Sequence, residues 1–133
     1  MTESRVFVGI SKVSNVNSLE YLKAIFSDKE IVPVKVEKTI HLKTACSYAG
    51  NNIILLCPTY INSKIFKGYE IVEVPKNEFF AANCLAKNGK VVIPEKSNRA
   101  LSTLEDKGFE VKTVDISEFI LAEGSLTCLS ILH

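Results

Sequence analysis

The sequence lacks the patterns that mark several large classes of protein. Its 133 residues contain no run approaching the ~20 apolar residues that a membrane-spanning helix needs. Residues 1–5 carry no apolar run of the kind that opens a secretory signal. Sixteen Lys and Arg residues against 15 Asp and Glu give a net charge of +1, without the basic excess that nucleic-acid binding requires. These absences predict a cytoplasmic protein that binds neither a membrane nor nucleic acid.

The cysteines also lack the spacing of a metal or disulfide framework. The four of them, Cys46, Cys57, Cys84 and Cys128, form no CxxC pair and match no zinc-site spacing. A chain without a secretory signal is not expected to form a disulfide framework. We therefore predict reduced thiols and no metal or other cofactor. Free cysteines are usually buried as small apolar residues, and that is the expectation for Cys46, Cys57 and Cys84.

The residues that are present predict a folded α/β chain. Apolar residues make up 47% of the sequence, which is typical of a globular protein, and the length suggests one domain with a sizeable core. Segments rich in β-branched and aromatic residues predict strands at residues 5–10, 31–36, 52–57, 69–74, 90–93 and 109–114. Helical spacing predicts helices after Ser18 and Ser97 as N-caps and a short helix at residues 61–66, with Gly68 and Gly108 as helix ends.

The same order of elements recurs with a step of 40 residues. That step separates Glu30, Glu70 and Glu110, and it also relates Glu78-Phe79 to Glu118-Phe119. After each later strand comes a loop and then an apolar segment with a cysteine. The pattern predicts one domain, residues 1–133, of three strand–helix–strand–strand repeats at roughly 5–50, 51–88 and 89–133, because one such unit cannot cover its own apolar face. The alternative is an ordinary α/β sandwich with coincidental spacing.

Two stretches carry candidate chemistry. Residues 122–133 form an acidic, glycine-containing turn that leads into a predicted apolar strand with Cys128 near its start, where a rigid scaffold often holds a reactive group. Residues 40–50 contain His41, the only histidine away from the chain end. Both residues also have a structural alternative, as a buried thiol and a structural imidazole. Together they supply two ligands, which do not complete a zinc site.

Five short motifs, taken in order, resemble one family. They are Val8-Gly9-Ile10-Ser11-Lys12, Ile40-His41-Leu42-Lys43, Cys46-Ser47-Tyr48-Ala49-Gly50, Ala81-Ala82-Asn83-Cys84 and Leu126-Thr127-Cys128. They look like the C-terminal half of dimethylarginine dimethylaminohydrolase, of the guanidine-modifying superfamily that includes arginine deiminase and the amidinotransferases. The resemblance spans about residues 5–133. It implies a partial α/β propeller, pentein-like, in which the three repeats are the last three of five modules around a central active site.

The resemblance also implies roles for individual residues. Cys128 matches the family nucleophile and His41 matches its general acid/base. A guanidinium carbon is a poor electrophile, so the thiolate form is needed, and nearby positive charge favours it. Ala122 falls where the family offers a backbone carbonyl to the substrate; an ordinary loop residue is the alternative. Lys12 could bind an acidic group of the substrate as a point charge.

The sequence departs from the family in two respects. Val13 stands where the family has an arginine that holds the substrate's α-carboxylate, and valine cannot form that bidentate pair. The family's N-terminal half supplies the carboxylates that clamp the guanidinium, and those residues have no counterpart here. An incomplete ring leaves apolar faces and strand edges that tend to associate. We therefore predict association with a separate N-terminal half or with another copy of this chain.

The sequence leaves three hypotheses for function. The first is a hydrolase that acts on a C–N bond of a small-molecule guanidine, with Cys128 as nucleophile and His41 as acid/base. The second is a non-catalytic binding or interaction module that keeps the fold and has lost turnover. The third is an amidinotransferase-like enzyme, which Leu42-Lys43 disfavours because those enzymes usually have an aspartate two residues after the histidine.

Overall fold

The structure divides into two compact units. The computed structural model describes residues 1–131; the terminal His133, which the sequence predicts to be solvated, lies outside the described residues. The first unit is Met1–Leu42 and the second is Lys43–His133. The division falls inside the first predicted repeat, whereas the other two repeats lie together in the second unit. Within residues 1–131, no helix is long and apolar enough to cross a membrane.

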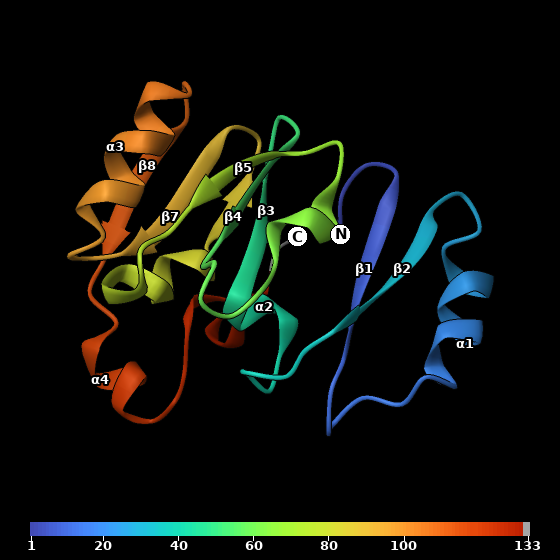
Figure 1. Ribbon diagram of the computed structural model, residues 1–133. Coiled ribbons are helices and arrows are strands. Elements are labelled where there is room, and N and C mark those ends of the chain that lie inside the picture. The colour runs from blue at the N-terminus through green and yellow to red at the C-terminus, as the bar shows by residue number, and fades with distance from the viewer. Residues whose placement is uncertain (132–133) are drawn as a thin grey trace. The chain divides into compact units, whose positions relative to one another are not determined.

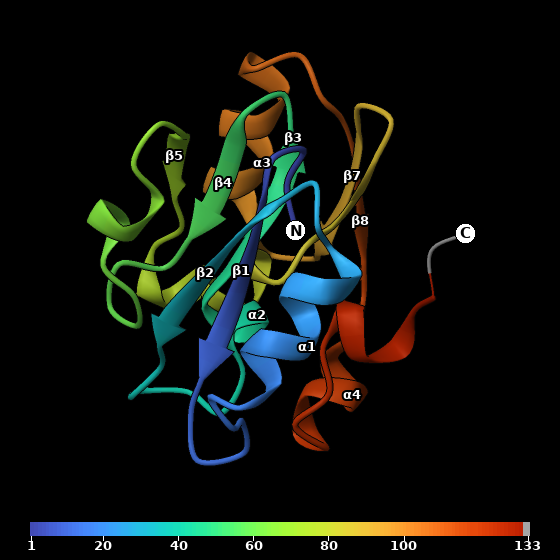
Figure 2. The same cartoon turned by 90° about the vertical axis from the view of Figure 1, so that its right-hand side faces the viewer.

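The first unit is a strand–helix–strand module. β1 (Arg5–Ile10) and β2 (Glu30–Lys35) pair in parallel, and α1 (Ser18–Ile25) connects them. Figure 2 shows the two strands side by side with α1 along one side of the pair. The helix begins where the sequence predicted, but Ser18 is its first residue rather than its cap. The Ser18 hydroxyl donates to the Asn15 carbonyl at 2.6 Å, so it does not accept from the helix N–H groups.

Gly9 is required by a close approach inside the first unit. A Cβ added at this position would lie 2.8 Å from Cβ of Leu42 and 3.3 Å from a methyl group of Val36. Carbon atoms do not approach so closely, and the first of these contacts involves a Cβ that cannot rotate away. Glycine near the end of this strand therefore allows the segment after β2 to pack against β1.

We expect Gly9→Ala to destabilise the first unit. Overpacking against the Leu42 Cβ should lower the free energy of unfolding by roughly 1–3 kcal/mol, measured by urea denaturation followed by circular dichroism. Ala24→Ser, an exposed substitution on α1, is the control and should change stability by less than about 0.5 kcal/mol. An unchanged unfolding midpoint for Gly9→Ala would show that this approach is looser than the structure indicates.

The second unit contains two three-stranded sheets and several short helices. Figure 1 shows α3 beside β8 and the shorter helices around the strands. The elements are α2 (Leu42–Ala45, which starts at the last residue of the first unit), β3 (Cys46–Gly50), β4 (Ile53–Leu56), the 3₁₀ helix η1 (Ser63–Phe66), β5 (Glu70–Glu73), the 3₁₀ helix η2 (Lys76–Ala82), β6 (Leu85–Lys87), β7 (Lys90–Pro94), α3 (Asn98–Asp106), β8 (Glu110–Val114), α4 (Ser117–Leu121) and the 3₁₀ helix η3 (Leu126–Leu129).

Each sheet is shared between consecutive predicted repeats. The strand orders are β3-β4-β5 and β6-β7-β8, and the first strand of each sheet is antiparallel to its neighbour while the last two are parallel. β3 and β6 come from the end of one repeat and pair with strands of the next. This exchange gives a physical reason why one repeat would not be stable alone.

The core of the second unit lies between these sheets and α3. Leu55, Val74, Val91 and Leu104 are fully buried in one apolar cluster. Ser97 lies at the predicted N-cap of α3, but its side chain makes no cap bond. The carboxylate of Glu78 instead accepts from the N–H groups of Arg99 and Ala100, at 3.2 and 3.1 Å. The helix is thus capped from η2, by a residue 21 and 22 positions before the two donors in the sequence.

The predicted glycine positions are confirmed, whereas the last predicted strand is wrong. Gly68 and Gly108 have φ values of 96° and 83°, in the left-handed region that suits a helix end. The segment after Gly124 forms η3 instead of a strand. Within its described residues, 125–131, Leu126 is the only buried apolar side chain, whereas Leu129 and Ile131 are exposed, so no second apolar position among them holds the segment against a sheet.

Candidate active site

Cys128 is an exposed thiol on a short, anchored helix. It lies in η3, and its N–H donates to the Ser125 carbonyl at 3.0 Å. The turn before it contains Glu123, with φ of 58°, and Gly124, whose N–H donates to the Phe119 carbonyl at 2.8 Å. A Cβ at Gly124 would lie 3.1 Å from that carbonyl oxygen, so glycine allows the tight return from α4. The turn predicted before Cys128 is therefore present.

Ala122 lies at the start of this turn. It caps α4, and its N–H donates to the Phe119 carbonyl at 3.0 Å. Its predicted role, as the donor of a backbone carbonyl to the substrate, stays a prediction.

The other three cysteines are core residues, as the sequence predicted. Cys46, Cys57 and Cys84 are all buried. Burial raises the pKa of the Cys46 thiol and that of the Cys84 thiol to about 12 each, because a thiolate would lose its hydration there. Cys46 and Cys84 occupy the cysteine positions of the first two predicted repeats. Of the three repeat-related thiols, Cys128 is thus the one that solvent and a substrate can reach.

This difference predicts selective thiol labelling. In the native protein at about pH 8, we expect iodoacetamide to modify Cys128 and to leave the buried Cys46, Cys57 and Cys84 unmodified. The raised pKa of Cys46 and of Cys84, about 12 each, also keeps these two thiols protonated at that pH. Peptide mapping by mass spectrometry gives the modified positions. In urea all four should react. Native labelling of Cys46 or Cys84 at the rate of Cys128 would contradict the predicted difference.

Asn83 ties together two segments that flank the candidate residues. Only 3% of Asn83 is exposed. Its side-chain Nδ2 donates to the Lys43 carbonyl at 3.0 Å, and its Oδ1 accepts from the N–H of Thr127 at 3.0 Å. Thr127 immediately precedes Cys128, and Lys43 follows His41 by two residues. One buried amide thus fixes both the backbone just before Cys128 and the start of the second unit.

Asn83 belongs to the motif of residues 81–84, but the motif alone does not indicate its role. A buried amide must use its polar groups, and the signal available was an Asn between two alanines and Cys84 in an otherwise apolar segment. The sequence does not show which distant backbone groups such an amide binds.

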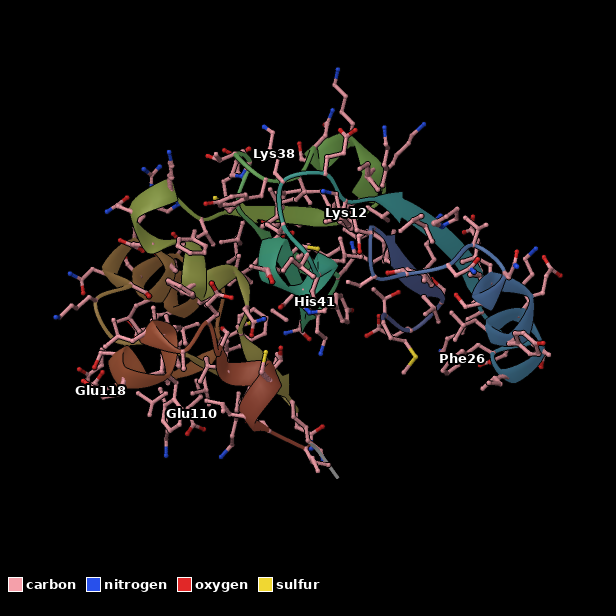
Figure 3. All side chains as sticks on the ribbon, turned by 90° about the horizontal axis from the view of Figure 1, so that it is seen from below. Lys12, Phe26, Lys38, His41, Glu110 and Glu118 are labelled. Atoms are coloured by element: carbon pink, nitrogen blue, oxygen red, sulfur yellow. The ribbon has the colours of Figure 1, made fainter. Side chains whose placement is uncertain are left out.

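His41 lies at the end of the first unit, next to a cavity. Its side chain is exposed, and its carbonyl accepts from the Thr39 hydroxyl at 3.0 Å. A cavity of about 650 Å³ in the first unit is lined by Ser11, Lys12, Val13, Val36, Glu37, Lys38, Thr39 and Ile40. Figure 3 labels Lys12, Lys38 and His41 in this unit. The loop after β1 and the segment just before His41 therefore share one cavity.

The cavity contains Lys12, one of the two residues predicted to contact the substrate, and Val13, which stands where the resembled family has an arginine. Lys12 offers an ammonium group, and the neighbouring Val13 offers an exposed apolar side chain. The predicted contact of Lys12 with the substrate stays a prediction. Among residues 1–131, no group of three or more His, Cys, Asp and Glu side chains could hold a metal ion.

Similar proteins are known, although no family model matches the chain. The chain is 29% identical over 133 residues to dimethylarginine dimethylaminohydrolase of Pseudomonas aeruginosa, covering 98% of this chain and 52% of that protein. It is 31% identical over 132 residues to an uncharacterised protein of Aeropyrum pernix, covering 97% and 48%. The chain therefore spans about half the length of the curated relatives it matches.

Solved structures give the same picture. The Pseudomonas aeruginosa dimethylarginine dimethylaminohydrolase, as a mutant complexed with citrulline, superposes with a TM-score of 0.88 at 28% identity, covering 96% of this chain and 51% of that one. The N-terminal domain of a cyanobacterial arginine dihydrolase gives a TM-score of 0.82 at 18% identity, which shows a similar fold and nothing further.

These comparisons place the fold among the α/β enzymes that modify guanidines. Within that class, the sequence and the structure are similar to about half of dimethylarginine dimethylaminohydrolase, so the resemblance predicted from the five motifs is confirmed. The α/β class predicted for the fold is confirmed by the same structures.

Proposed function

We propose that the chain is the nucleophile-bearing half of a hydrolase that cleaves a C–N bond of a guanidine. In this proposal its three repeats form part of a five-module α/β propeller in the cytoplasm. The observation that carries the proposal is the exposure of Cys128, while its counterparts Cys46 and Cys84 are buried. The similarity of nearly the whole chain to dimethylarginine dimethylaminohydrolase supports the choice of substrate class.

The proposed reaction has two stages. Cys128 Sγ, as a thiolate, attacks the guanidinium carbon; a C–S bond forms, the C–N bond breaks, and His41 gives its proton to the departing amine. His41 then takes a proton from water, whose oxygen attacks the thiouronium carbon. The C–S bond breaks, the thiolate of Cys128 returns, and a urea derivative leaves. Each proton moved by His41 is returned within one cycle, so no cofactor is needed.

Asn83 acts in this proposal as a positioning residue. A nucleophile must be held within tenths of an ångström of its productive place, and the side chain of Cys128 starts from a backbone that Asn83 anchors through Thr127 N. The same amide fixes Lys43 O at the start of α2. Loss of the amide should therefore disturb the orientation of Cys128 more than its exposure.

The cavity near His41 is the proposed place for the distal part of the substrate. Lys12 supplies a single positive charge there, and Val13 makes part of the wall apolar. Ala122 remains the proposed source of a backbone carbonyl for the substrate. We expect a guanidine whose distal end does not depend on a bidentate arginine pair, because no arginine is among the described residues that line this cavity. The remaining guanidinium contacts would come from a separate N-terminal half or from another copy of the chain.

A cationic probe tests the proposal directly. Chloroacetamidine carries the charge and planarity of a guanidinium, whereas chloroacetamide is its neutral counterpart of nearly equal size. With the chain assembled with the half or copy that completes the proposed site, we expect chloroacetamidine to modify Cys128 at least about tenfold faster, relative to the ratio for a free cysteine peptide, since the proposed site binds a cation. Cys128→Ser is the control for the position of the adduct. Equal relative rates for the two probes would contradict the hydrolase proposal.

A specific observation also favours the second hypothesis. Val13 replaces the residue expected to hold a carboxylate and is largely exposed, which suits a binding module that has lost turnover. The two functions differ in product formation. A module of that kind would bind a guanidine without releasing a urea derivative, and Cys128→Ser would leave its affinity unchanged.

A further inference from the structure

The cavity of the first unit carries an excess of positive charge. Lys12 and Lys38 contribute ammonium groups, and Glu37 contributes the single carboxylate among the described residues that line it. That carboxylate is already bound, because Lys35 Nζ lies 2.6 Å from Glu37 Oε1. The hydrogen bond and charge of Lys35, with a smaller effect of the charge on Lys38, lower the pKa of Glu37. Three ammonium groups therefore accompany one ionised carboxylate.

Lys12 has no partner of its own in this set. Among residues 1–131, its ammonium group makes no hydrogen bond or ion pair with the protein. The backbone on either side of it is held in a turn: the Val13 N–H donates to the Ser11 hydroxyl at 3.3 Å, and the Ser14 N–H donates to the Ser11 carbonyl at 3.2 Å. An unpaired ammonium group beside a cavity attracts an anionic ligand.

The rest of the cavity wall is largely apolar. Val36 is buried, whereas the side chains of Val13 and Ile40 are 64% and 60% exposed and available to a ligand. The Thr39 hydroxyl also lines the cavity, but its proton is directed to the His41 carbonyl. The volume of about 650 Å³ is typical of a small-molecule site. A matching ligand has an apolar middle and an anionic end.

We propose that this cavity selects an ω-guanidino acid, in which a short alkyl chain joins the guanidinium to a carboxylate and no α-ammonium group is present. The inference rests on the proposed function, which assigns the distal end of the substrate to this cavity. The carboxylate pairs with Lys12, and the methylene groups cover Val13 and Ile40. The guanidinium end then points toward His41, which follows Ile40 in the sequence.

The α-ammonium group of an amino acid is the feature that this cavity rejects. In arginine the carboxylate and the ammonium group are bonded to one carbon, so a carboxylate paired with Lys12 brings the ammonium group beside like charge. The Glu37 carboxylate, which could otherwise accept it, is bound by Lys35. Like charges brought together discriminate against a ligand. The compound 5-guanidinopentanoate, which is arginine without its α-ammonium group, keeps the attraction and lacks the repulsion.

Equilibrium binding to the full chain tests this selection without turnover. We use Cys128→Ser, follow the backbone amides by ¹H–¹⁵N NMR, and titrate 5-guanidinopentanoate, L-arginine and the neutral 5-guanidinopentanamide. The shifts should be confined to amides of residues 11–13 and 36–40, which line the cavity. We expect the Kd of 5-guanidinopentanoate to be at least about tenfold lower than that of L-arginine, and about 3- to 10-fold lower than that of the amide.

Substitutions in the cavity test the assigned charges. Lys12→Met should bring the Kd values of the acid and the amide to within about twofold, and Lys12→Glu should reverse the preference between the acid and L-arginine. Glu37→Gln should keep the order of the three ligands, because this carboxylate does not bind them. Lys64→Met, at an exposed lysine of η1 outside the cavity, is the control and should change none of the constants. Lys12 is exposed, so circular dichroism should show unchanged folding.

Three results would overturn the selection. They are equal affinity for L-arginine and 5-guanidinopentanoate, a loss of L-arginine binding alone in Glu37→Gln, and no saturable shift up to about 20 mM ligand. This failure is distinct from failure of the proposed function. Hydrolysis of L-arginine as readily as of 5-guanidinopentanoate would keep the hydrolase and remove the selection, whereas the expected order of binding without any turnover by the native chain would do the reverse.

Discussion

Replacing Asn83 with alanine is expected to lower the free energy of unfolding by roughly 2–4 kcal/mol. The substitution removes one donor and one acceptor from a buried position, and it leaves the Lys43 carbonyl and the Thr127 N–H without their shared partner. Buried backbone groups that lose a hydrogen bond pay the cost of desolvation without compensation. Urea denaturation followed by circular dichroism measures the change.

A matched control variant and the reactivity of Cys128 show whether Asn83 also positions Cys128. Asn62 caps η1 by accepting from the N–H of Lys64 at an exposed site, so Asn62→Ala should cost about 1 kcal/mol or less. In Asn83→Ala we expect the preference of Cys128 for chloroacetamidine over chloroacetamide to fall by about tenfold, while its reaction with the neutral probe changes little. If Asn83→Ala loses the predicted stability but Cys128 keeps its preference for chloroacetamidine, Asn83 is a structural residue only.

Replacing Cys128 with serine is expected to abolish turnover, with a loss of at least about 10³-fold in kcat. Serine keeps the size of the side chain but is a far weaker nucleophile without an adjacent base to activate it. The residue is exposed, so the unfolding midpoint should not move. The assay is colorimetric detection of the urea derivative formed from a panel of alkylguanidines and arginine derivatives.

Cys84→Ala is the matched control for this substitution. It removes a thiol at the corresponding place of the second repeat, where the side chain is buried. We expect a loss of stability of about 1–2 kcal/mol from the lost packing and no change in the preference for the cationic probe. Turnover that survives Cys128→Ser would exclude this thiol as the nucleophile.

Local patterns in the sequence predicted much of the fold. The pattern that repeats every 40 residues predicted the first and last residues of β5 and β8 to within about one or two positions. Gly68 and Gly108 were predictable because a left-handed helix end favours glycine strongly. The core role of Cys46 and Cys84 followed from the general burial of free thiols.

Features that depend on distant partners were not predictable in this way. Ser97 has the residue type of an N-cap, but the first N–H groups of α3 are bound by Glu78. Asn83 acquires its partners only when residues 43 and 127 are brought to it. The predicted strand after Gly124 fails because Leu126 is the only buried apolar side chain among the described residues 125–131, and one such position does not distinguish a strand from a helical turn.

The central claim is that Cys128 forms a covalent intermediate that His41 resolves. The most direct measurement is intact-protein and peptide mass spectrometry after reaction with an S-alkylisothiourea, whose thiol leaves without a proton from histidine. We predict an amidino adduct on Cys128 that accumulates in His41→Ala and stays below detection in the native chain, which releases urea instead. No adduct on Cys128 in His41→Ala, or adducts of equal lifetime in both proteins, would contradict the claim.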